Sequence, residues 1–325
     1  MSAFPTFVHL RLHSEYSITD GIVRVDEAVT KAAADDMPAL ALTDLSNLFG
    51  LVKFYQEARA SGVKPIIGCD VWISNDVDRD KPVRILLLCQ SYAGYLRLCR
   101  LLSRAYRENQ HRDRAEIKKA WFEDKEEGTD GLIALSGADT GDIGLMLMQN
   151  DSAQASMLAR EWAKLFPGRF YIEVQRAGCV NAEALVQRSL MLASTLSLPV
   201  VATHPVQFLN SEDYRAHEAR VCIAEGYILG DRRRPQSCTE QQYFKTQAEM
   251  RALFADIPSA LANTAELAKR CNLTLELGVN RLPLFPTPNQ ESLEHYLREQ
   301  AETGLEIRMK ALFPDAAMRS VEMPK

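Results

Sequence analysis

The sequence contains no pair of closely spaced cysteines. Its seven cysteines, at positions 69, 89, 99, 179, 222, 238 and 271, are scattered and odd in number, and none belongs to a C-x-x-C pair. Disulfide frameworks and zinc knuckles both need cysteines paired at short, regular spacings. The pattern therefore predicts reduced thiols in a cytoplasmic protein, and it excludes a disulfide-stapled fold as well as a zinc knuckle.

Long apolar runs and an excess of positive charge are also missing. The longest apolar runs fall far short of the roughly 20 residues that cross a bilayer, and Met1–Pro5 lacks the basic and apolar stretches of a secretory signal. There are 38 Lys and Arg residues against 43 Asp and Glu residues, a net charge of −5. The missing apolar runs predict no membrane contact. Because duplex-binding modules carry a basic excess, we also expect that this segment is not the main nucleic-acid-binding surface.

Short apolar runs alternate with amphipathic ones along most of the 325 residues. Strands that alternate with helices predict parallel pairing through right-handed crossovers, and seven of them favour closure into a barrel. The predicted strands are Thr6–Leu10, Ala39–Thr43, Pro65–Ile73, Arg84–Cys89, Gly131–Leu135, Phe170–Gln175 and Pro199–Thr203. The helices predicted between them are Val25–Asp35, Leu48–Ser61, Tyr92–Tyr106, Ser152–Phe166 and Ala182–Leu196.

After the last predicted strand the pattern becomes helical. Leu282–Pro288 places three prolines in seven residues, and since proline fixes φ and lacks an amide donor, this predicts an extended connector. No internal repeat and no low-complexity tract is visible. The predicted late helices are Ser211–Glu225, Thr246–Phe254, Pro258–Cys271 and Glu291–Phe313.

Polar residues gather at the ends of the predicted strands, where barrel enzymes place their chemistry. Together they would form a metal or phosphate pocket at one rim. Each of them alone also has an ordinary structural explanation, since an aspartate after a strand is a frequent helix N-cap. The residues are His9, Asp44, Asp70, Ser136, Gln175 and His204, with Asp20 just beyond the first strand.

The segment His9–Ser17, read as HLRLHSEYS and followed by Asp20-Gly21, resembles the first motif of the polymerase and histidinol phosphatase (PHP) domain. More specifically, it resembles the N-terminus of bacterial DNA polymerase III alpha subunits. The resemblance implies an α/β fold, a distorted seven-stranded β/α (TIM-like) barrel over residues 1–277. It implies that residues 278–325, a helical C-terminal extension, are a connector and the start of the polymerase palm region. Further matches run in order along essentially the whole chain, at Met37–Asp44, Asn47–Tyr55, Lys64–Gly68, Gly131–Gly137, Leu198–Thr203, Leu253–Pro258, Ala268–Asn272 and Leu282–Pro286.

Active members of this family hold up to three metal ions with His, Asp and Glu ligands at the strand ends, and here that ligand set is largely missing. His9, Asp20 and Asp70 match ligand positions, with Asp70 a shorter replacement for glutamate. Three residues cannot supply a multinuclear site, so we predict no catalytic residue and no metal, while one weak site at these three remains possible. The positions that have lost a ligand are Arg11, Leu45, Val83, Ala177, Pro205 and Gln207.

A carboxylate cluster that loses its metal ions keeps negative charges that are costly to bury unpaired. We therefore hypothesise that the guanidinium of Arg11 replaces the metal as counter-charge and pairs with Asp20 or Asp70. Arginine suits this role because it is always charged and can bind one carboxylate through two donors. His13 is given no catalytic role, and Arg176 is expected to be a solvated loop residue.

The resemblance implies a piece of a replicative polymerase whose DNA-directed DNA polymerase activity, a nucleotidyl transfer with Mg²⁺, lies further along the full-length chain. For the piece itself it implies a non-catalytic scaffold without cofactor. Its partners would be the epsilon proofreading exonuclease and the rest of the DNA polymerase III holoenzyme, with DNA bound through the full-length chain. A residual metal-dependent phosphoesterase or pyrophosphatase is the alternative. A stand-alone histidinol-type phosphatase is disfavoured by the polymerase-like tail at Leu282–Pro288.

One arginine run has two interpretations. It could contact nucleic acid, or it could be the solvated face of a helix, which the acidic composition of the whole chain favours. The run consists of Arg97, Arg100, Arg104, Arg107, Arg112 and Arg114.

Overall fold

The computed structural model describes residues 7–124, 128–231, 233, 239–280 and 282–322. By its internal contacts the chain divides into two compact units, Met1–Leu275 and Glu276–Lys325. Within the described residues, no helix is both long enough and apolar enough to cross a membrane.

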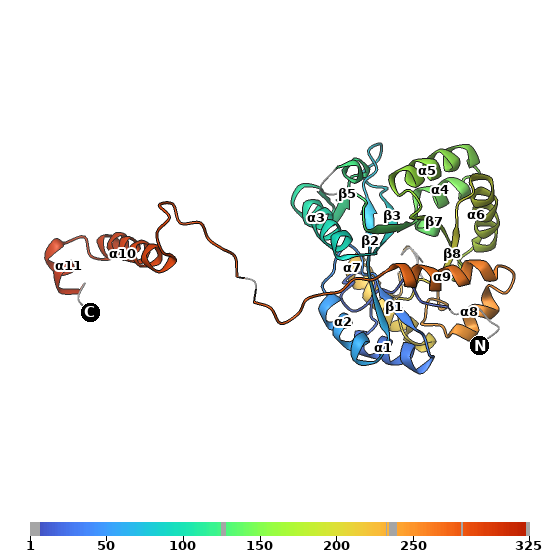
Figure 1. The fold of residues 1–325 in the computed structure, drawn as a ribbon, viewed down its shortest axis with the longest axis horizontal. Helices are drawn as coiled ribbons and strands as arrows, with labels where there is room; N and C mark the ends of the chain where they lie inside the picture. The colour runs from blue at the N-terminus through green and yellow to red at the C-terminus, as the bar shows by residue number, and fades with distance from the viewer. Residues whose placement is uncertain (1–6, 125–127, 232, 234–238, 281, 323–325) are drawn as a thin grey trace. The chain divides into compact units, whose positions relative to one another are not determined.

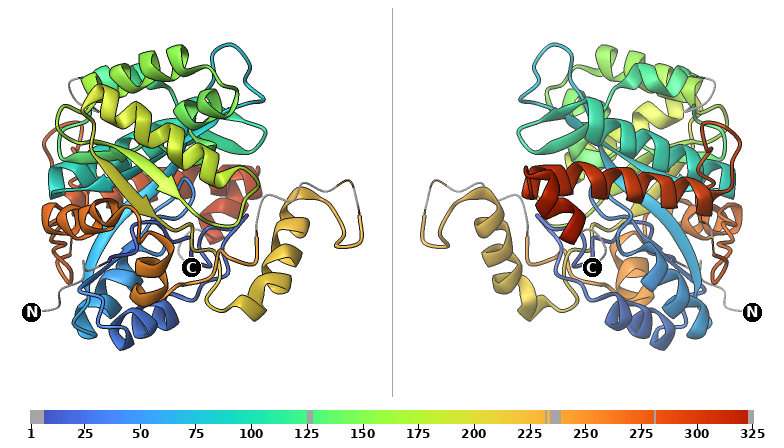
Figure 2. Two further views of the ribbon diagram at one scale, coloured as in Figure 1. Left: turned by 90° about the vertical axis from the view of Figure 1, so that its right-hand side faces the viewer. Right: turned by 90° about the vertical axis from the view of Figure 1, so that its left-hand side faces the viewer.

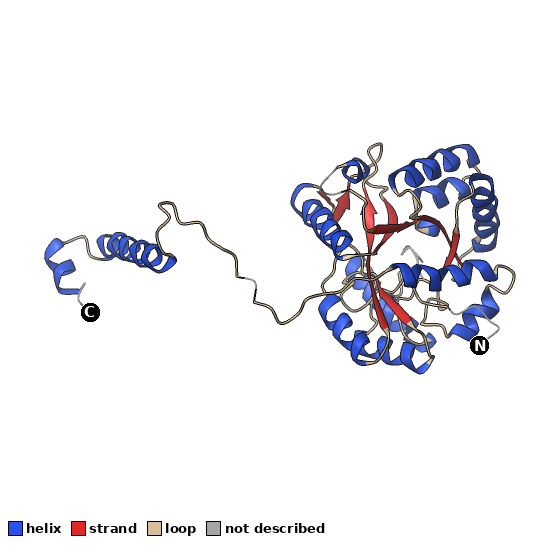
Figure 3. Ribbon diagram, viewed as in Figure 1, coloured by secondary structure: helices blue, strands red, loops and turns tan. Residues whose placement is uncertain are grey.

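The first unit is built on an eight-stranded sheet in the order β4-β5-β2-β3-β6-β7-β8, with β1 paired to β2. Figures 1 and 3 show these strands surrounded by helices. The α/β class is confirmed. The strands are β1 (Ala39–Leu42), β2 (Lys64–Ile73), β3 (Val83–Cys89), β4 (Gln110–His111), β5 (Arg114–Ile117), β6 (Leu132–Leu135), β7 (Phe170–Gln175) and β8 (Val200–Thr203).

The expectation of parallel pairing throughout was wrong at β3, which runs antiparallel to both of its neighbours, β2 and β6. The reason is the connection Ser74–Pro82, which contains no helix. A parallel crossover needs about a dozen residues or more, so this short loop can only reverse the chain. The pairs β1–β2, β6–β7 and β7–β8 are parallel, as expected.

The hairpin of β4 and β5 was not predicted. Its turn residues Arg112 and Asp113 have φ of 47° and 62°, the left-handed conformation of a type I′ turn. Such turns are recognised in a sequence by Asn-Gly or Asp-Gly, and neither stands here. The signal that would have revealed this hairpin is therefore absent at this turn.

The first predicted strand lies partly outside the described residues, at Thr6, and Phe7–Leu10 is not part of the sheet proper. The chain here nevertheless runs beside β1, since the amide of Ala41 donates to the carbonyl of His9 at 2.9 Å. A little further on, the amide of His13 donates to the carbonyl of Val206, just after β8, at 2.9 Å. The segment thus joins the two flanks of the sheet, while the closed seven-stranded barrel stays a prediction.

The helices of the first unit lie around the outside of the strands (Figure 2). Several begin at the caps that the sequence offers: the hydroxyl of Ser91 accepts from the amide of Gly94, Thr246 and Glu249 form a capping box, and Pro258 opens α9. The helices are α1 (Val25–Ala34), α2 (Leu51–Ala60), α3 (Tyr92–Glu108), α4 (Asp142–Met148), α5 (Ser152–Leu165), α6 (Ala182–Leu196), α7 (Tyr214–Glu225), α8 (Gln247–Leu253) and α9 (Pro258–Arg270). Of these, α4 was not predicted.

Two apolar clusters lie on opposite sides of the strands, as the alternation of strand side chains requires. On β3, Ile85 and Leu87 belong to the larger cluster, which also holds the buried faces of α1 to α6. Leu86 and Leu88 belong to the smaller one, which also takes in Leu267 of α9. We call the face of the sheet that bears the smaller cluster the inner face. This alternation decides which side chains of each strand reach the candidate site.

The second unit contains α10 (Leu293–Leu312), which fulfils the predicted late helix, and α11 (Ala316–Glu322). The hydroxyl of Ser292 caps α10 by accepting from the amide of His295. The assignment of this part to a polymerase palm stays a prediction.

Candidate functional site

A cleft of about 820 Å³ lies at the end of the sheet where β2 and β7 finish. Asp20 lines it, and its wall also carries most of the positions at which the sequence predicted a lost ligand. These are Arg11, Leu45, Ala177, Pro205 and Gln207. Five of the six positions therefore lie around one cleft, together with charged groups that the sequence did not point to.

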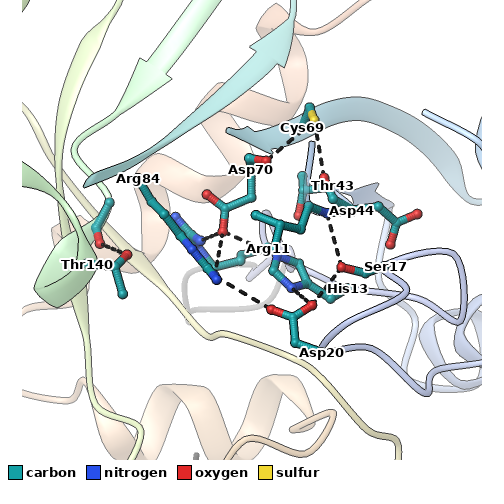
Figure 4. Close-up of polar contacts among 12 residues, drawn as sticks. Arg11, His13, Ser17, Asp20, Thr43, Asp44, Cys69, Asp70, Arg84 and Thr140 are labelled. Atoms are coloured by element: carbon teal, nitrogen blue, oxygen red, sulfur yellow. Dashed lines mark hydrogen bonds and ion pairs between the residues drawn. The ribbon is translucent and has the colours of Figure 1, made fainter. Parts of the chain in front are cut away.

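Arg11 lies at the centre of the polar network beside this cleft, almost fully buried (Figure 4). Its Nη1 donates to Oδ2 of Asp70 at 2.5 Å. Its Nε and Nη2 donate to the two carboxylate oxygens of Glu173 at 3.0 and 3.1 Å, the two-donor geometry that suits guanidinium best. Arg11 therefore pairs with Asp70, one of its two expected partners, and with Glu173, but makes no ion pair with Asp20 among the described contacts.

His13 bridges two of the carboxylates. Its Nδ1 lies 3.0 Å from Oδ1 of Asp20, and its Nε2 lies 3.3 Å from Oδ2 of Asp70. Asp20 is held further by the hydroxyl of Ser17, which donates to it at 2.7 Å, and by the side-chain amide of Gln207 at 3.4 Å. His13, to which the sequence assigned no catalytic role, is thus part of the network.

A second guanidinium closes the network from β3. Nη1 of Arg84 lies 3.6 Å from Oδ2 of Asp20 and 3.5 Å from Oδ2 of Asp70 (Figure 4). Its guanidinium also covers the ring of Trp72 at 4.3 Å, a cation–π contact that fixes its position. Arg84 therefore shares its charge between the two aspartates.

These contacts control the protonation of the buried groups. Burial alone would lower the pKa of His13, but the charges and hydrogen bonds of Asp20 and Asp70 outweigh it and raise the pKa to about 9. Burial would raise the pKa of Asp20, and the imidazolium of His13, with Arg84 and Ser17, instead holds it well below its usual range. Burial likewise opposes ionisation of Asp70, while Arg11, His13 and Arg84 lower its pKa. At neutral pH His13 is therefore a cation and both aspartates are anions.

The network balances its own charge. Three cations, Arg11, His13 and Arg84, face three carboxylates, those of Asp20, Asp70 and Glu173. Glu173 also accepts hydrogen bonds from Thr203, Gln175 and the amide of Gly137, which satisfy both of its oxygens. Buried charges that are paired and hydrogen-bonded in this way can stay in the interior without an ion.

His9, expected as a remnant ligand, lies outside this network. Its Nε2 contacts the carbonyl of Lys245 at 2.8 Å, and its ring packs on Phe244 with centroids 4.5 Å apart. Burial lowers its pKa to about 4, so it is neutral. The expected set of His9, Asp20 and Asp70 is therefore not brought together. The histidine that joins the two aspartates is His13.

Strand alternation explains two further differences from the sequence assignment. Val83 is only half-buried and packs against the larger apolar cluster on the outer side of β3, so the adjacent Arg84 is the residue that reaches the cleft. On β7, Glu173 has the same parity as Tyr171, which belongs to the inner cluster, and as Gln175 and Ala177, which line the cleft. Counting in steps of two from Ala177 would have found Glu173, the carboxylate that the sequence reading missed.

The remaining positions have structural roles. Leu45 lines the cleft, and its amide donates a hydrogen bond to the hydroxyl oxygen of Ser17 at 3.1 Å. Asp44 accepts from the amide and the hydroxyl of Ser14 at 2.6 and 2.9 Å, and burial raises its pKa to about 6. Arg176 pairs with Glu183 and Asp256. It is therefore not the solvated loop residue that we expected, and it does not belong to the network either.

The residues present do not fit the metal cluster that the family resemblance implies. Oδ2 of Asp70, the oxygen nearest to all three cations, lies within 3.5 Å of Arg11, His13 and Arg84. A divalent ion bound there would be packed against two guanidiniums and an imidazolium, whose charges repel it. Leu45, Ala177 and Pro205, which stand at positions where the resemblance expects ligands, line the same cleft and offer no side-chain ligand atom.

The raised pKa of His13 predicts a pH dependence of stability with a definite sign. Because the pKa is 6.5 when unfolded and about 9 when folded, the pairing stabilises the protein fully below pH 6.5 and is lost as the pH rises through 9. The full effect corresponds to a stabilisation on the order of 3 kcal/mol. We expect urea unfolding of the His13→Gln variant to show a flatter pH profile between pH 6.5 and 9 than the wild type.

The control for this prediction is His295→Gln, which removes an exposed histidine that pairs with Glu291 at 2.6 Å. Exposed pairs contribute little to stability, so this variant should keep the wild-type profile. A His13→Gln protein with the full wild-type slope would show that His13 is not the group responsible.

The burial of the Arg11 network predicts a large loss on removing the guanidinium. Arg11→Met leaves Glu173 buried without its counter-charge and removes the shortest ion pair of Asp70, so the free energy of unfolding should fall by roughly 3–5 kcal/mol. Arg176→Met removes an arginine that also pairs with two carboxylates, but those are more than half exposed and can be hydrated. It should lower the free energy of unfolding by about 1 kcal/mol or less.

A triple variant separates charge from packing. Combining Arg11→Met with Asp70→Asn and Glu173→Gln removes the two negative charges together with the positive one, and we expect it to recover much of the lost stability. If the triple variant is no more stable than Arg11→Met alone, the arginine acts by filling space and not by compensating charge.

Comparison with known proteins supports the sequence resemblance. A family model described as the PHP domain matches residues 9–177. The chain is 47% identical over 323 residues to DNA polymerase III subunit alpha of Neisseria meningitidis, covering 99% of this chain and 28% of that protein. It is 43% identical over 321 residues to the same subunit of Escherichia coli, covering 99% of this chain and 27% of that protein. The chain therefore spans little more than a quarter of the length of these relatives.

Among solved structures, an amidohydrolase from Chromobacterium violaceum, described with bound sulfate and no metal, aligns over 66% of this chain and 97% of its own. The TM-score is 0.39 and the identity 16%, which is too remote for an argument about function. The family model, in contrast, covers more than half of the chain and includes the segment that carries Arg11, His13, Asp20, Asp70 and Glu173. The chain belongs to the PHP domain family.

Proposed function

We propose that this chain is the PHP region of a bacterial DNA polymerase III alpha subunit and acts in it as a non-catalytic scaffold. The extent of the match to alpha subunits supports the placement. Polymerisation of DNA, with Mg²⁺, would be carried by other parts of a much longer protein, in the cytoplasm. This chain would contribute stability and a docking surface.

The observation that carries the non-catalytic role is the pairing of three cations with three carboxylates at the cleft. Phosphoester hydrolysis by metals needs ions that clamp phosphate oxygens and activate a water molecule. Here the carboxylates that would hold such ions are occupied by Arg11, Arg84 and His13. His13 is protonated at neutral pH because of its raised pKa, so it cannot accept a proton from water as a general base.

The same contacts account for a scaffold. Arg11 connects the N-terminal segment to β2 through Asp70 and to β7 through Glu173, while Arg84 brings in β3. These elements are far apart in sequence, so the network cross-links them at one end of the sheet. In a metal-binding member of the family, a metal cluster would make this cross-link instead. A rigid end of the sheet would give the rest of the polymerase a fixed surface to pack against.

The proposal predicts no metal-dependent turnover. With Mn²⁺ or Zn²⁺ added, phosphate release from pyrophosphate or from a nucleotide should be the same for the wild type and for the Asp20→Asn variant. Elemental analysis of the purified chain should find no stoichiometric metal. Metal-dependent phosphate release that disappears in Asp20→Asn would establish the alternative function, a residual phosphoesterase, and would overturn the non-catalytic role.

The docking role is tested separately. We expect the epsilon proofreading exonuclease of the same organism to co-elute with this chain in size-exclusion chromatography and to bind it in calorimetry. The Asp20→Asn variant should bind equally well, since docking does not use the chemistry of the cleft. Absence of a complex with the wild-type chain would remove docking from the proposal while leaving the placement in the polymerase intact.

A further inference from the structure

A group of basic side chains lies at the end of the sheet opposite the cleft. Lys64 opens β2 and Arg169 directly precedes β7, whereas the cleft lies where these strands end. Arg97 comes from α3, and Lys269 and Arg270 end α9. We call these five residues the basic face.

The side chains of the basic face are held mainly by neutral oxygen atoms. Nη1 of Arg97 donates to the carbonyl of Asp130 at 2.8 Å, and Arg169 donates to the carbonyls of Thr129 and Leu132. These carbonyls accept from the guanidiniums and hold them in place, but they do not neutralise the charge. The cations are therefore preorganised and remain attractive to an anion.

The other two anchored side chains follow the same pattern. Arg270 donates to the hydroxyl oxygen of Tyr171 and the carbonyl of Gly168 at 2.5 and 3.0 Å. Nζ of Lys64 donates to the carbonyl of Ala268 at 2.7 Å and to Oδ1 of Asn272 at 2.8 Å. None of these acceptors carries a formal charge.

Negative charge at the basic face is scarce. Among the residues that the structure describes, the carboxylates in ion-pair contact with it are Asp130, shared by Arg97 and Arg169, and Glu266, which pairs with Lys269. Five positive and two negative charges give a local excess of +3. The net charge of the chain is −5, so the rest of the chain carries −8. The positive excess is thus concentrated at one end of an acidic protein.

This concentration is unfavourable in the chain by itself. Burial lowers the pKa of Arg169, and the neighbouring charges of Arg270 and Arg97 lower it further although Asp130 opposes them. The repulsion also shows that the three arginines lie within electrostatic reach of one another. Like charges held together by fixed side chains favour the binding of a polyanion that relieves the repulsion.

We propose that the basic face binds the sugar-phosphate backbone of DNA. Three of its five cations are arginines, whose planar donors match phosphate oxygens better than an ammonium does. A hollow of about 410 Å³, lined by alanines and also by Glu266, lies between Lys64 and Lys269 and gives a phosphate room to approach. The contact is independent of base sequence. It goes beyond the proposed function, in which other parts of the polymerase hold DNA.

The test measures binding of a fluorescent DNA duplex to the 325-residue chain by anisotropy, at salt concentrations from about 50 to 200 mM. We expect weak binding that salt abolishes. Lys269→Glu should weaken it several-fold and reduce the slope of log K against log salt by about one. Asp130→Asn should strengthen it several-fold, because it removes the carboxylate shared by two arginines. If Asp130 served only to hold its own loop in place, Asp130→Asn would not increase the affinity for DNA.

The matched control is Lys81→Glu. Lys81, like Lys269, is a highly exposed lysine paired with a carboxylate three residues earlier, but it lies in the loop between β2 and β3. It should bind DNA as the wild type does.

Three outcomes would overturn the proposal: no binding by the wild type at the lowest salt, equal effects of Lys269→Glu and Lys81→Glu, or no gain in Asp130→Asn. Displacement of DNA by poly-glutamate at equal charge concentration would also overturn it, in favour of an acidic protein segment as the partner.

Discussion

The two-sided pairing of Arg11 is the interaction on which the rest of the site depends. One guanidinium reaches Asp70 on β2 and both oxygens of Glu173 on β7. Without it, two carboxylates that are almost completely inaccessible to water would face each other across the end of the sheet. Repulsion between them would either open the sheet or force one of them to take up a proton. Arg11 prevents both outcomes because its guanidinium pairs with both carboxylates at once.

The other cations extend the same solution. His13 and Arg84 approach Oδ2 of Asp70 from two further sides and also compensate Asp20. Metal ions can compensate several carboxylates at once because each carries two charges at a single point. Side chains must do it with several groups from different elements, and here those groups come from the N-terminal segment and from β3. The result differs from a metal site in one respect: each cation is covalently part of the chain and cannot be exchanged or lost.

Much of the fold and part of the site followed from the sequence, and the limits have identifiable physical causes. Six of the seven predicted strands correspond to strands of the sheet, and Arg11, Leu45 and Gln207, three of the lost ligand positions, lie around one cleft. Glu173 and Arg84 were missed because a motif names a position along the chain, whereas the face of a strand is decided by parity. On β3 that parity selects Arg84 and directs Val83 to the outer side.

The misplacement of His9 has a different cause. Val8 and Leu10 belong to the inner apolar cluster, which directs His9 outward onto Phe244. Regular alternation would then turn Arg11 outward as well, yet Arg11 and His13 both reach the cleft. The alternation therefore breaks between Leu10 and Arg11. The charges of Asp70 and Glu173 supply the reason, since a buried arginine turned away from them would leave its own charge and that of Glu173 unpaired in the interior. In this segment electrostatic compensation, and not the strand period, decides which side chains face inward.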